Sequence, residues 1–246
     1  MPLKDKVALV TGSSRGIGRA IAFKLAEEGC HLAINYLSNT QAAEQVKKQI
    51  IRMEGEAALF PGDVSNFADA EEMVKKVKSD YGRIDILVNN VGPFLYKSIY
   101  DTSIQEWHGI FNSNLNSVFY CCKAVVPIMR QQKSGVIINI GAPNAERTQG
   151  YTRNCAYATA KTGVVVFSKS LAKEEAQNGI KVNVVNPGFV ETDNYSEEEK
   201  KHWSQEIPMR RMGTPEELAN AVAFLCSDED SYITGSVLNV HGGLWC

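Results

Sequence analysis

The sequence predicts an α/β fold in which helices cover both faces of a mainly parallel sheet. Short, apolar, β-favouring runs alternate with segments of helical periodicity along all 246 residues. The run from Ile84 to Val88 is almost continuously apolar, which is typical of a central parallel strand that is buried on both faces. No linker, repeat or low-complexity tract interrupts the chain. We therefore expect residues 1–246 to form a single domain.

A strand, a turn and a helix open the chain. Four β-favouring residues at 7–10 run into a glycine-rich turn at 11–18, and apolar residues then recur at helical spacing to about residue 25. Glycines let the backbone bend sharply, approach a ligand closely and pack the helix against the strand. The unpaired amides and the dipole at a helix start favour a pyrophosphate. With glycines at Gly12, Gly16 and Gly18, this pattern predicts a dinucleotide site in a doubly wound, Rossmann-type domain.

The same turn also fits a second motif, the G-x-S-x-G pattern of a hydrolase nucleophile. That interpretation makes Ser14 the nucleophile, and it needs a later carboxylate followed by a histidine. Of the four histidines, only His241 comes late enough in the chain to serve. Because the hydrolase hypothesis leaves Gly18 without a purpose, we keep it as a remote alternative.

The composition argues against several classes of partner and site. The net charge is −2 and acidic and basic residues are interspersed, which does not favour nucleic acid or a membrane surface. No apolar run reaches membrane-spanning length, and the first residues lack the apolar core of a signal peptide. The six cysteines lack paired metal-ligand spacing, so we expect reduced thiols, no metal site and a cytoplasmic protein.

The remaining elements follow from periodicity and capping signals. Ser103 with Glu106, and Thr214 with Glu217, form capping boxes that begin helices. Residues 189–213 are polar and have room for one short helix, so we expect a substrate lid there. Strands are expected at 31–36, 57–60, 84–88, 136–140, 180–185 and 237–240, and helices at 40–54, 66–81, 103–130, 155–177 and from 215.

The end of the second strand bears on the choice of cofactor. Folds that prefer NAD place a carboxylate about 20 residues past the glycine turn, where it binds the ribose 2′-hydroxyl. Here the corresponding window contains Asn35, Tyr36 and Ser38 but no carboxylate. A 2′-phosphate would not be repelled and Arg15 could pair with it, so we predict NADP(H). Asp63, after the third strand, could accept a hydrogen bond from adenine, although a helix-entry role explains it nearly as well.

Tyr157 and Lys161 lie one turn apart on one face of the helix expected at 155–177. A free tyrosine titrates near ~10, too high for ready proton exchange at neutral pH. A neighbouring ammonium, together with the positive ring of a nicotinamide, would favour the phenolate and lower that pKa. The pair can therefore move a proton to or from a carbonyl oxygen while a hydride moves to or from its carbon. Such a pair is common by chance, and it indicates a catalytic role here because a dinucleotide turn precedes it in the chain.

The motifs together resemble those of the short-chain dehydrogenase/reductase family over essentially the whole chain. The family's order and spacing are matched by the glycine turn, Asp63-Val64, Asn89-Asn90-Val91-Gly92, Asn114, Tyr157-x3-Lys161 and Pro187-Gly188. Within the family, residues 187–193 are most similar to 3-oxoacyl-acyl-carrier-protein reductases. The resemblance implies an oxidoreductase that reduces a ketone or 3-oxoacyl carbonyl with NADP(H). It also implies a homotetramer, or a dimer, packed through the two long helices.

The resemblance implies roles for individual residues as well. Tyr157 would be the general acid in reduction, Lys161 would bind the nicotinamide ribose and tune Tyr157, and Asn114 would hold a water that connects Lys161 to solvent. Asn90 and Gly92 would line the adenosine side. The cofactor would be held by Gly12, Ser14, Arg15, Gly16, Ile17, Gly18, Asn35, Tyr36, Ser38, Asp63, Val64, Asn90, Gly92, Tyr157, Lys161 and, at the nicotinamide end, Pro187, Gly188, Val190 and Thr192.

One departure concerns the family's catalytic serine, which hydrogen-bonds the substrate oxygen beside the tyrosine. Counting from the strand that ends near Ile140 gives Ala142, and counting back from Tyr157 gives Asn144, because the loop is two residues longer. Neither is serine, and loss of such a donor can cost several kcal/mol in the transition state. The Asn144 amide could substitute, with Thr148 as a weaker candidate. The alternative hypothesis is an NADP(H)-binding protein of the same fold with weak or no catalysis.

Overall fold

A computed structural model describes residues 3–192, 195–227 and 232–244, and it confirms the predicted parallel sheet. Its strands are β1 (Val7–Val10), β2 (His31–Tyr36), β3 (Glu56–Pro61), β4 (Ile86–Asn89), β5 (Gly135–Ile140), β6 (Ile180–Pro187) and β7 (Val237–Val240). Within the described ranges these seven strands form one sheet in the order β3-β2-β1-β4-β5-β6-β7, and all neighbouring pairs are parallel.

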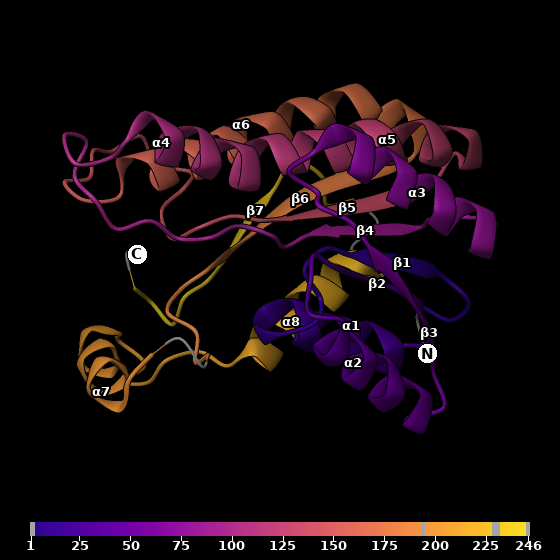
Figure 1. Ribbon diagram of the computed structural model, residues 1–246, viewed down its shortest axis with the longest axis horizontal. Coiled ribbons are helices and arrows are strands. Elements are labelled where there is room, and N and C mark those ends of the chain that lie inside the picture. The colour runs from indigo at the N-terminus through magenta and orange to yellow at the C-terminus, as the bar shows by residue number, and fades with distance from the viewer. Residues whose placement is uncertain (1–2, 193–194, 228–231, 245–246) are drawn as a thin grey trace.

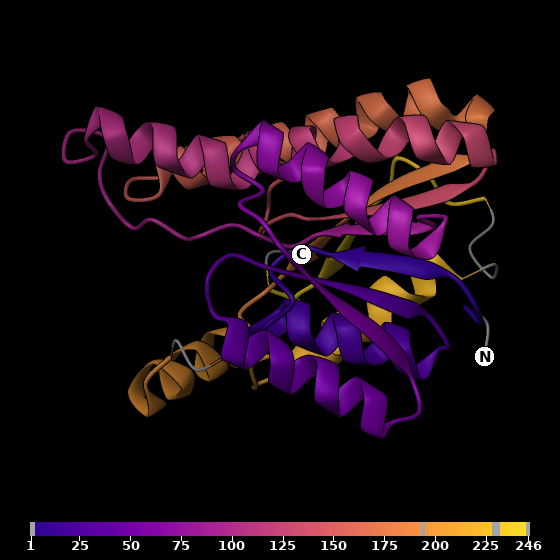
Figure 2. The ribbon, with the colours of Figure 1, turned by 45° about the vertical axis from the view of Figure 1, so that its right-hand side comes forward.

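Helices cover both faces of this sheet, as predicted. They are α1 (Gly16–Glu27), α2 (Thr40–Arg52), α3 (Phe67–Tyr81), α4 (Ile104–Phe111), α5 (Ser117–Gln132), α6 (Cys155–Glu175), α7 (Glu197–Glu206) and α8 (Pro215–Cys226). Figure 1 and Figure 2 show α3, α4, α5 and α6 in one layer, α1, α2 and α8 in the other, and α7 standing apart. No helix within the described ranges combines the length and the apolar character needed to cross a membrane.

The core consists of two apolar layers, one on each side of the sheet. Because side chains alternate along a strand, Ala8 and Val10 of β1 pack in the cluster of α1 and α8, whereas Val7 and Leu9 pack in that of α3 and α5. Both faces of the central strands are therefore sealed, and only their ends are available for a site.

The helix predicted over 103–130 is divided. Ser103 and Glu106 form the predicted capping box at the start of α4. A π-helical turn, Asn112–Asn116, then leads directly into α5. Such turns are rare and frequently occur at functional sites, and this one carries the buried Asn114. The apolar spacing did not reveal the turn, because one wider turn hardly alters the pattern of a long helix.

The strand order reverses between β1 and β4. From β1 the chain builds outward to β3, and from β4 it builds in the opposite direction to β7. Loops that follow these two strands therefore leave toward opposite layers, and the crevice between them is where open α/β sheets bind ligands. The glycine turn follows β1 and the Asn90–Gly92 stretch follows β4, so both predicted motifs meet at this crevice.

The segment at 189–213 is a loop with one short helix, α7, as expected, and its residues 193 and 194 lie outside the described part. Its two ends are tied together, because the Glu191 amide donates to the Gly213 carbonyl (2.8 Å) and the Gly213 amide donates to the Phe189 carbonyl (2.9 Å). Trp203 of α7 stacks on Phe189 with ring centroids 3.8 Å apart. The segment is thus anchored at its base, and its action as a lid stays a prediction.

An ion pair joins α5 to the end of α6. Glu175 is buried and accepts hydrogen bonds from Arg130 Nε (2.8 Å) and Asn178 Nδ2 (2.9 Å), with a second bond from the Arg130 guanidinium. These bonds, chiefly those from Arg130, hold the pKa of Glu175 below its usual value.

We predict that Glu175→Gln lowers the free energy of unfolding at pH 7 by about 1.5–3 kcal/mol, the range for hydrogen bonds to charged groups. Because the native pKa lies below the unfolded value of about 4.3, this stabilisation is complete above that pH and disappears as the pH falls through the native pKa. Urea titrations of the two proteins should therefore converge in acid. Glu174→Gln, at the exposed neighbouring position, is the control, and an equal effect there contradicts the interpretation.

Candidate active site

The glycine turn has the close packing that the sequence predicts. Gly12 and Gly16 have φ values of 61° and 54°, in the region that favours glycine. A Cβ on Gly18 would lie 2.5 Å from the Gly12 carbonyl oxygen, so a side chain cannot fit there. A Cβ on Gly16 would meet nothing within 4 Å, which shows that the outer side of the turn is open. The turn thus combines close packing inside with open space outside.

The start of α1 is available to an anion. Arg15 occupies the N-cap, is exposed and makes no capping hydrogen bond, and the first turn carries no acidic residue. The first amides of the helix therefore lack a side-chain partner, and the helix dipole favours negative charge there. Ser14, Arg15 and Gly16 line a cavity of about 410 Å³ between α1 and α2, while Ile17 packs against the core. These residues fit a pyrophosphate.

Asn35 and Tyr36, at the end of β2, are both buried. Asn35 Oδ1 accepts from the Gly12 amide, and Nδ2 donates to the carbonyls of Phe60 and Gly62, all at 3.1 Å. The Asn35 amide is therefore occupied in tying the glycine turn to β2 and β3. Tyr36 is buried in the core, whereas Ser38 is exposed beyond the strand.

Asp63 performs the turn-forming role that the sequence allowed. Its Oδ1 accepts from the amide (2.9 Å) and the hydroxyl (2.7 Å) of Ser65. Within the described residues its Oδ2 accepts no hydrogen bond, so one carboxylate oxygen stays available to a ligand. Val64 is buried in the core.

Several hydrogen bonds join the loops on either side of the crevice. The Asn90 amide donates to Thr11 Oγ1 (2.9 Å), and Asn90 Nδ2 donates to the Thr11 carbonyl (3.0 Å). Gly92 follows and is exposed. A Cβ on Gly92 would lie 2.4 Å from Asn114 Oδ1 and 3.0 Å from Lys161 Nζ. The glycine therefore lets the Asn114 amide and the Lys161 ammonium approach the same point.

The Lys161 ammonium is buried, with one hydrogen bond, to the carbonyl of Ile140 at the end of β5 (2.8 Å). Burial lowers the pKa of Lys161 to about 8 because the charged form loses hydration. Its Nζ lies 5.9 Å from the ring centroid of Tyr157, one turn earlier on α6. The predicted pairing of phenol and ammonium on one helix face is therefore present.

Asn114 contributes an unsatisfied acceptor. Its Nδ2 donates to the carbonyls of Pro93 and Ile110, both at 3.1 Å. Its Oδ1 is buried and has no partner among the described residues. A buried acceptor without a donor is costly and is commonly satisfied by an ordered water. The orphaned oxygen thus fits the water that the family resemblance implies.

Tyr157 lies between two apolar clusters and is half-buried. It packs against the cluster of Ala142 and Val184 on one side and that of Ile110 and Ala160 on the other. Burial raises the pKa of Tyr157, and the lid residue Tyr195 adds to the shift. The lowered pKa expected from the sequence requires the nicotinamide ring as well as the ammonium and stays a prediction, whereas in the protein alone the lost hydration of the phenolate raises the pKa.

The structure distinguishes the two candidates for the serine position. Ala142, counted from the strand, belongs to the buried cluster that contacts Tyr157. Asn144 is also buried, at a φ of 58°, and its side chain makes no hydrogen bond within the described ranges. Thr148 is exposed. The position counted from the strand is therefore an alanine in the apolar cluster against which Tyr157 packs, and the Asn144 side chain makes no hydrogen bond within the described ranges.

Glu146, in the loop after β5, carries a carboxylate that no motif in the sequence indicated as part of the site. Glu146 accepts hydrogen bonds from Asn186 Nδ2 (2.7 Å) and Asn239 Nδ2 (2.8 Å), and the two amides bond each other (3.1 Å). The three side chains join the loop after β5 to the ends of β6 and β7. Glu146 is 40 positions from Asn186 and 93 from Asn239, so no local pattern could have shown the cluster.

The residues predicted for the nicotinamide end lie where β6 ends and the 189–213 segment begins. The Gly188 amide donates to the Val240 carbonyl (2.9 Å), and a Cβ on Gly188 would lie 2.7 Å from the His241 Cα atom. Pro187 and Thr192 are half-buried, and Val190 is buried. All of them are thus at the same sheet edge as Lys161.

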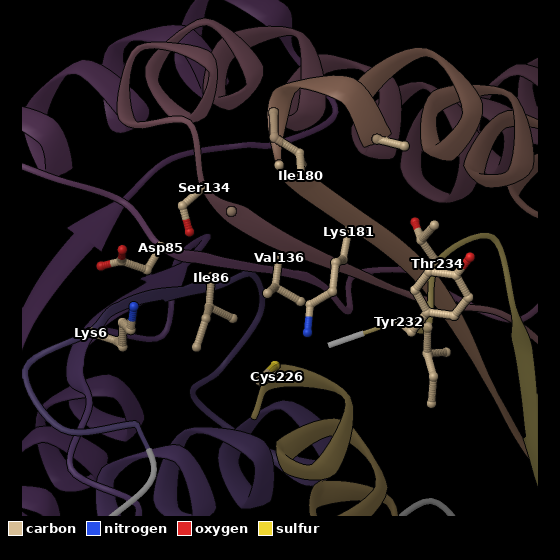
Figure 3. Close-up of a pocket in the computed structure, with 14 residues that line it drawn as sticks. Lys6, Asp85, Ile86, Ser134, Val136, Ile180, Lys181, Cys226, Tyr232 and Thr234 are labelled. Atoms are coloured by element: carbon tan, nitrogen blue, oxygen red, sulfur yellow. The ribbon is translucent and has the colours of Figure 1, made fainter. Parts of the chain in front are cut away.

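A larger cavity, of about 620 Å³, opens at the opposite edge of the sheet. Figure 3 shows Ile86, Val136 and Lys181 there, which stand at the amino ends of β4, β5 and β6. None of the predicted site residues lines this cavity, so it is separate from the candidate site. In the part of the chain that the structure describes, no group of three or more metal-ligating side chains could hold a metal ion. Ser14 likewise makes no hydrogen bond to a described histidine or carboxylate, so the hydrolase hypothesis gains no support.

The site therefore fits a nicotinamide dinucleotide. The glycine turn and the start of α1 suit a pyrophosphate, and the buried ammonium and the orphaned Asn114 oxygen stand beside the phenol. Comparison with known proteins agrees with this assignment. A family model described as enoyl-(acyl carrier protein) reductase matches residues 12–245.

Curated relatives align over nearly the full chain. The 3-oxoacyl-(acyl-carrier-protein) reductase FabG of Staphylococcus epidermidis is 39% identical over 244 residues, covering 98% of this chain and 99% of the relative. FabG of Escherichia coli strain K12 is 41% identical over 248 residues, covering 100% of this chain and 99% of the relative.

Solved structures give the same result. A putative short-chain alcohol dehydrogenase from Sinorhizobium meliloti superposes with a TM-score of 0.92 at 31% identity and covers 98% of this chain and 97% of its own. A double mutant of a Serratia marcescens short-chain dehydrogenase/reductase superposes with a TM-score of 0.93 at 32% identity and covers 100% of both chains. Fold, site and relatives agree that this chain belongs to the short-chain dehydrogenase/reductase family of oxidoreductases.

Proposed function

We propose that the protein is an NADP(H)-dependent carbonyl reductase that converts a ketone or 3-oxoacyl group to the alcohol. The observation that carries the proposal is the buried Lys161 ammonium one turn from Tyr157, beside the orphaned Asn114 oxygen. The names of the curated relatives support a 3-oxoacyl substrate class.

Bound NADPH would supply the hydride to the carbonyl carbon. Tyr157 gives its proton to the carbonyl oxygen, and its raised pKa keeps the phenol protonated until that moment. The Lys161 ammonium then stabilises the phenolate, since an opposite charge in a poorly hydrated site favours the ionised form. Asn114 Oδ1 holds a water that opens a proton path from Lys161 to solvent.

The substrate oxygen needs a second donor, and we propose the Asn144 amide for this role. Its side chain has no partner in the described structure, and Asn tolerates the left-handed backbone found there. A second candidate function, NADP(H) binding with weak or no catalysis, is favoured by an alanine, Ala142, in the cluster against which Tyr157 packs.

We propose NADP(H) over NAD(H) because the end of β2 carries no carboxylate and Arg15 stands exposed at the start of α1. Direct binding by the other cofactor residues predicted from the sequence stays part of this proposal, with Asn35 acting through the Gly12 amide.

We also propose that the chain assembles as a homotetramer, or a dimer, through α5 and α6. Phe119 of α5 and Val166 of α6 are 44% and 62% exposed, and Phe167 meets the Phe119 ring edge-on at 6.1 Å. Neighbouring exposed apolar side chains of this kind mark interfaces. A cytoplasmic location is part of the proposal, supported by the free cysteines of the described chain, such as Cys121 and Cys122, whose pKa burial raises.

We predict that Tyr157→Phe slows ketone reduction by roughly 10²–10⁴-fold, the range for general acid catalysis, and leaves NADPH binding intact. Loss of NADPH absorbance with a panel of ketones and 3-oxoacyl thioesters measures the rate. Wild-type kcat/KM should be level below pH 8 and fall above it, because Lys161 loses its proton near its pKa of about 8. Tyr81→Phe, remote on α3, is the control. A variant that keeps the wild-type rate would exclude Tyr157 as the acid.

We predict that Arg15→Ala weakens NADPH binding by about tenfold or more and leaves NADH binding nearly unchanged, since only NADPH carries the 2′-phosphate. Quenching of protein fluorescence by each cofactor gives the two dissociation constants. Arg52→Ala, at the exposed end of α2 and not among the residues that line this cavity, is the matched control. Equal losses for both cofactors would contradict the role of Arg15.

We predict that Asn144→Gly lowers kcat/KM for reduction by roughly 10²-fold or more, as expected when a transition-state donor is lost. Glycine keeps the left-handed backbone without strain, so the melting temperature should change little. An unchanged rate in a variant that binds NADPH normally would remove Asn144 from the mechanism. Wild-type protein that binds NADPH and reduces no ketone would instead establish the binding-protein alternative.

A further inference from the structure

Two exposed aromatic rings extend outward from Tyr157. Phe94 meets the Tyr157 ring edge-on, with centroids 5.0 Å apart and planes at 84°. Tyr96 stacks on Phe94 with centroids 6.2 Å apart and planes at 26°. The two side chains are 60% and 64% exposed, although aromatic rings of this size are strongly stabilised by burial. We call Phe94 and Tyr96 the aromatic shelf.

The backbone under the shelf is anchored, so the rings are held in place beside the site. Leu95, between them, packs inward against Ile110, Ala156 and Ala160. Lys97 forms a β-bridge with Asn154 and an ion pair with Glu106 of α4. Because neighbouring side chains of an extended segment alternate in direction, burial of Leu95 directs Phe94 and Tyr96 to the outside.

The two rings of the aromatic shelf differ in what lies over them. The guanidinium of Arg153 lies 5.9 Å from the Tyr96 ring centroid, within the range of a cation–π contact. Among the described residues no cation lies over the Phe94 ring, which adjoins the ring that carries the reacting hydroxyl. A group attached to a carbonyl at the Tyr157 hydroxyl would therefore meet the Phe94 ring.

We infer that the aromatic shelf binds an aromatic ring attached directly to the reacting carbonyl, so that aryl ketones are the substrate class of this site. The inference rests on the proposed function, because it concerns the same site. A flat π-system can pair edge-to-face or offset with Phe94, whereas a saturated ring of the same size provides area without the complementary quadrupole.

The test compares acetophenone with cyclohexyl methyl ketone, which have the same carbon skeleton and differ in the ring electrons. The measured quantity is the specificity ratio, kcat/KM for acetophenone divided by kcat/KM for cyclohexyl methyl ketone, with the full chain and NADPH. In Phe94→Leu the ratio should fall about threefold to tenfold, the effect of losing one aromatic pair. Comparing ratios between proteins cancels the difference in chemical reactivity of the two ketones.

Two further variants complete the design. Tyr96→Leu should lower the ratio in the same direction by a smaller factor, since Tyr96 acts through Phe94. Phe224→Leu is the matched control, because Phe224 is a 44% exposed phenylalanine on α8, which lies in the other helix layer, and the ratio should not change.

An unchanged or higher specificity ratio in Phe94→Leu overturns the inference that the aromatic shelf binds an aryl ring. A wild-type protein that reduces 3-oxoacyl thioesters but neither methyl ketone overturns it as well. Both outcomes leave the proposed carbonyl reductase intact. A wild-type protein that binds NADPH but reduces no carbonyl compound overturns the proposed function, and the substrate class with it.

Discussion

The reversal of strand order between β1 and β4 is the constraint on which the rest of the site depends. Loops leaving neighbouring parallel strands toward opposite layers must separate, and this opens a crevice at their carboxyl ends. The bonds from Asn90 to Thr11 fix its width. With the two loops held, the glycine turn presents the start of α1, and Gly92 allows Asn114 and Lys161 to approach each other.

Burial then sets the chemistry of the pair on α6. Loss of water makes the Tyr157 phenol harder to ionise and the Lys161 ammonium easier to discharge, so burial disfavours charge on either group alone. Proton donation by the phenol creates an anion next to that cation. In a medium of low polarity their attraction is strong and offsets part of the cost of burying the new charge. The pair is therefore suited to stabilise the phenolate that forms when Tyr157 donates its proton.

The loop after β5 lacks the serine that the family resemblance led us to expect, and tertiary contacts define it. Ala142 lies in the cluster against which Tyr157 packs, Asn144 adopts a left-handed conformation, and Glu146 ties the loop to Asn186 and Asn239. These two bonds hold the loop to the ends of β6 and β7, while Asn186 Oδ1 is buried without a partner among the described residues. Asn144 therefore lies in a loop that is tied to the sheet two residues later, at Glu146.

Local sequence determined the elements and the motifs. Alternation of apolar runs predicted the parallel sheet with helices on both faces, the capping boxes at Ser103 and Thr214 began helices as expected, and Tyr157 and Lys161 were placed on one helix face. Only the tertiary structure decided the π turn that carries Asn114, the rise of the Tyr157 pKa in the protein alone, the apolar cluster of Ala142 against Tyr157, the Glu146 cluster and the edge-on contact of Phe94. The physical reason is the distance along the chain over which each effect acts. Propensity, capping and helical spacing act over a few residues, whereas burial and side-chain contact depend on segments that meet only after the chain has folded.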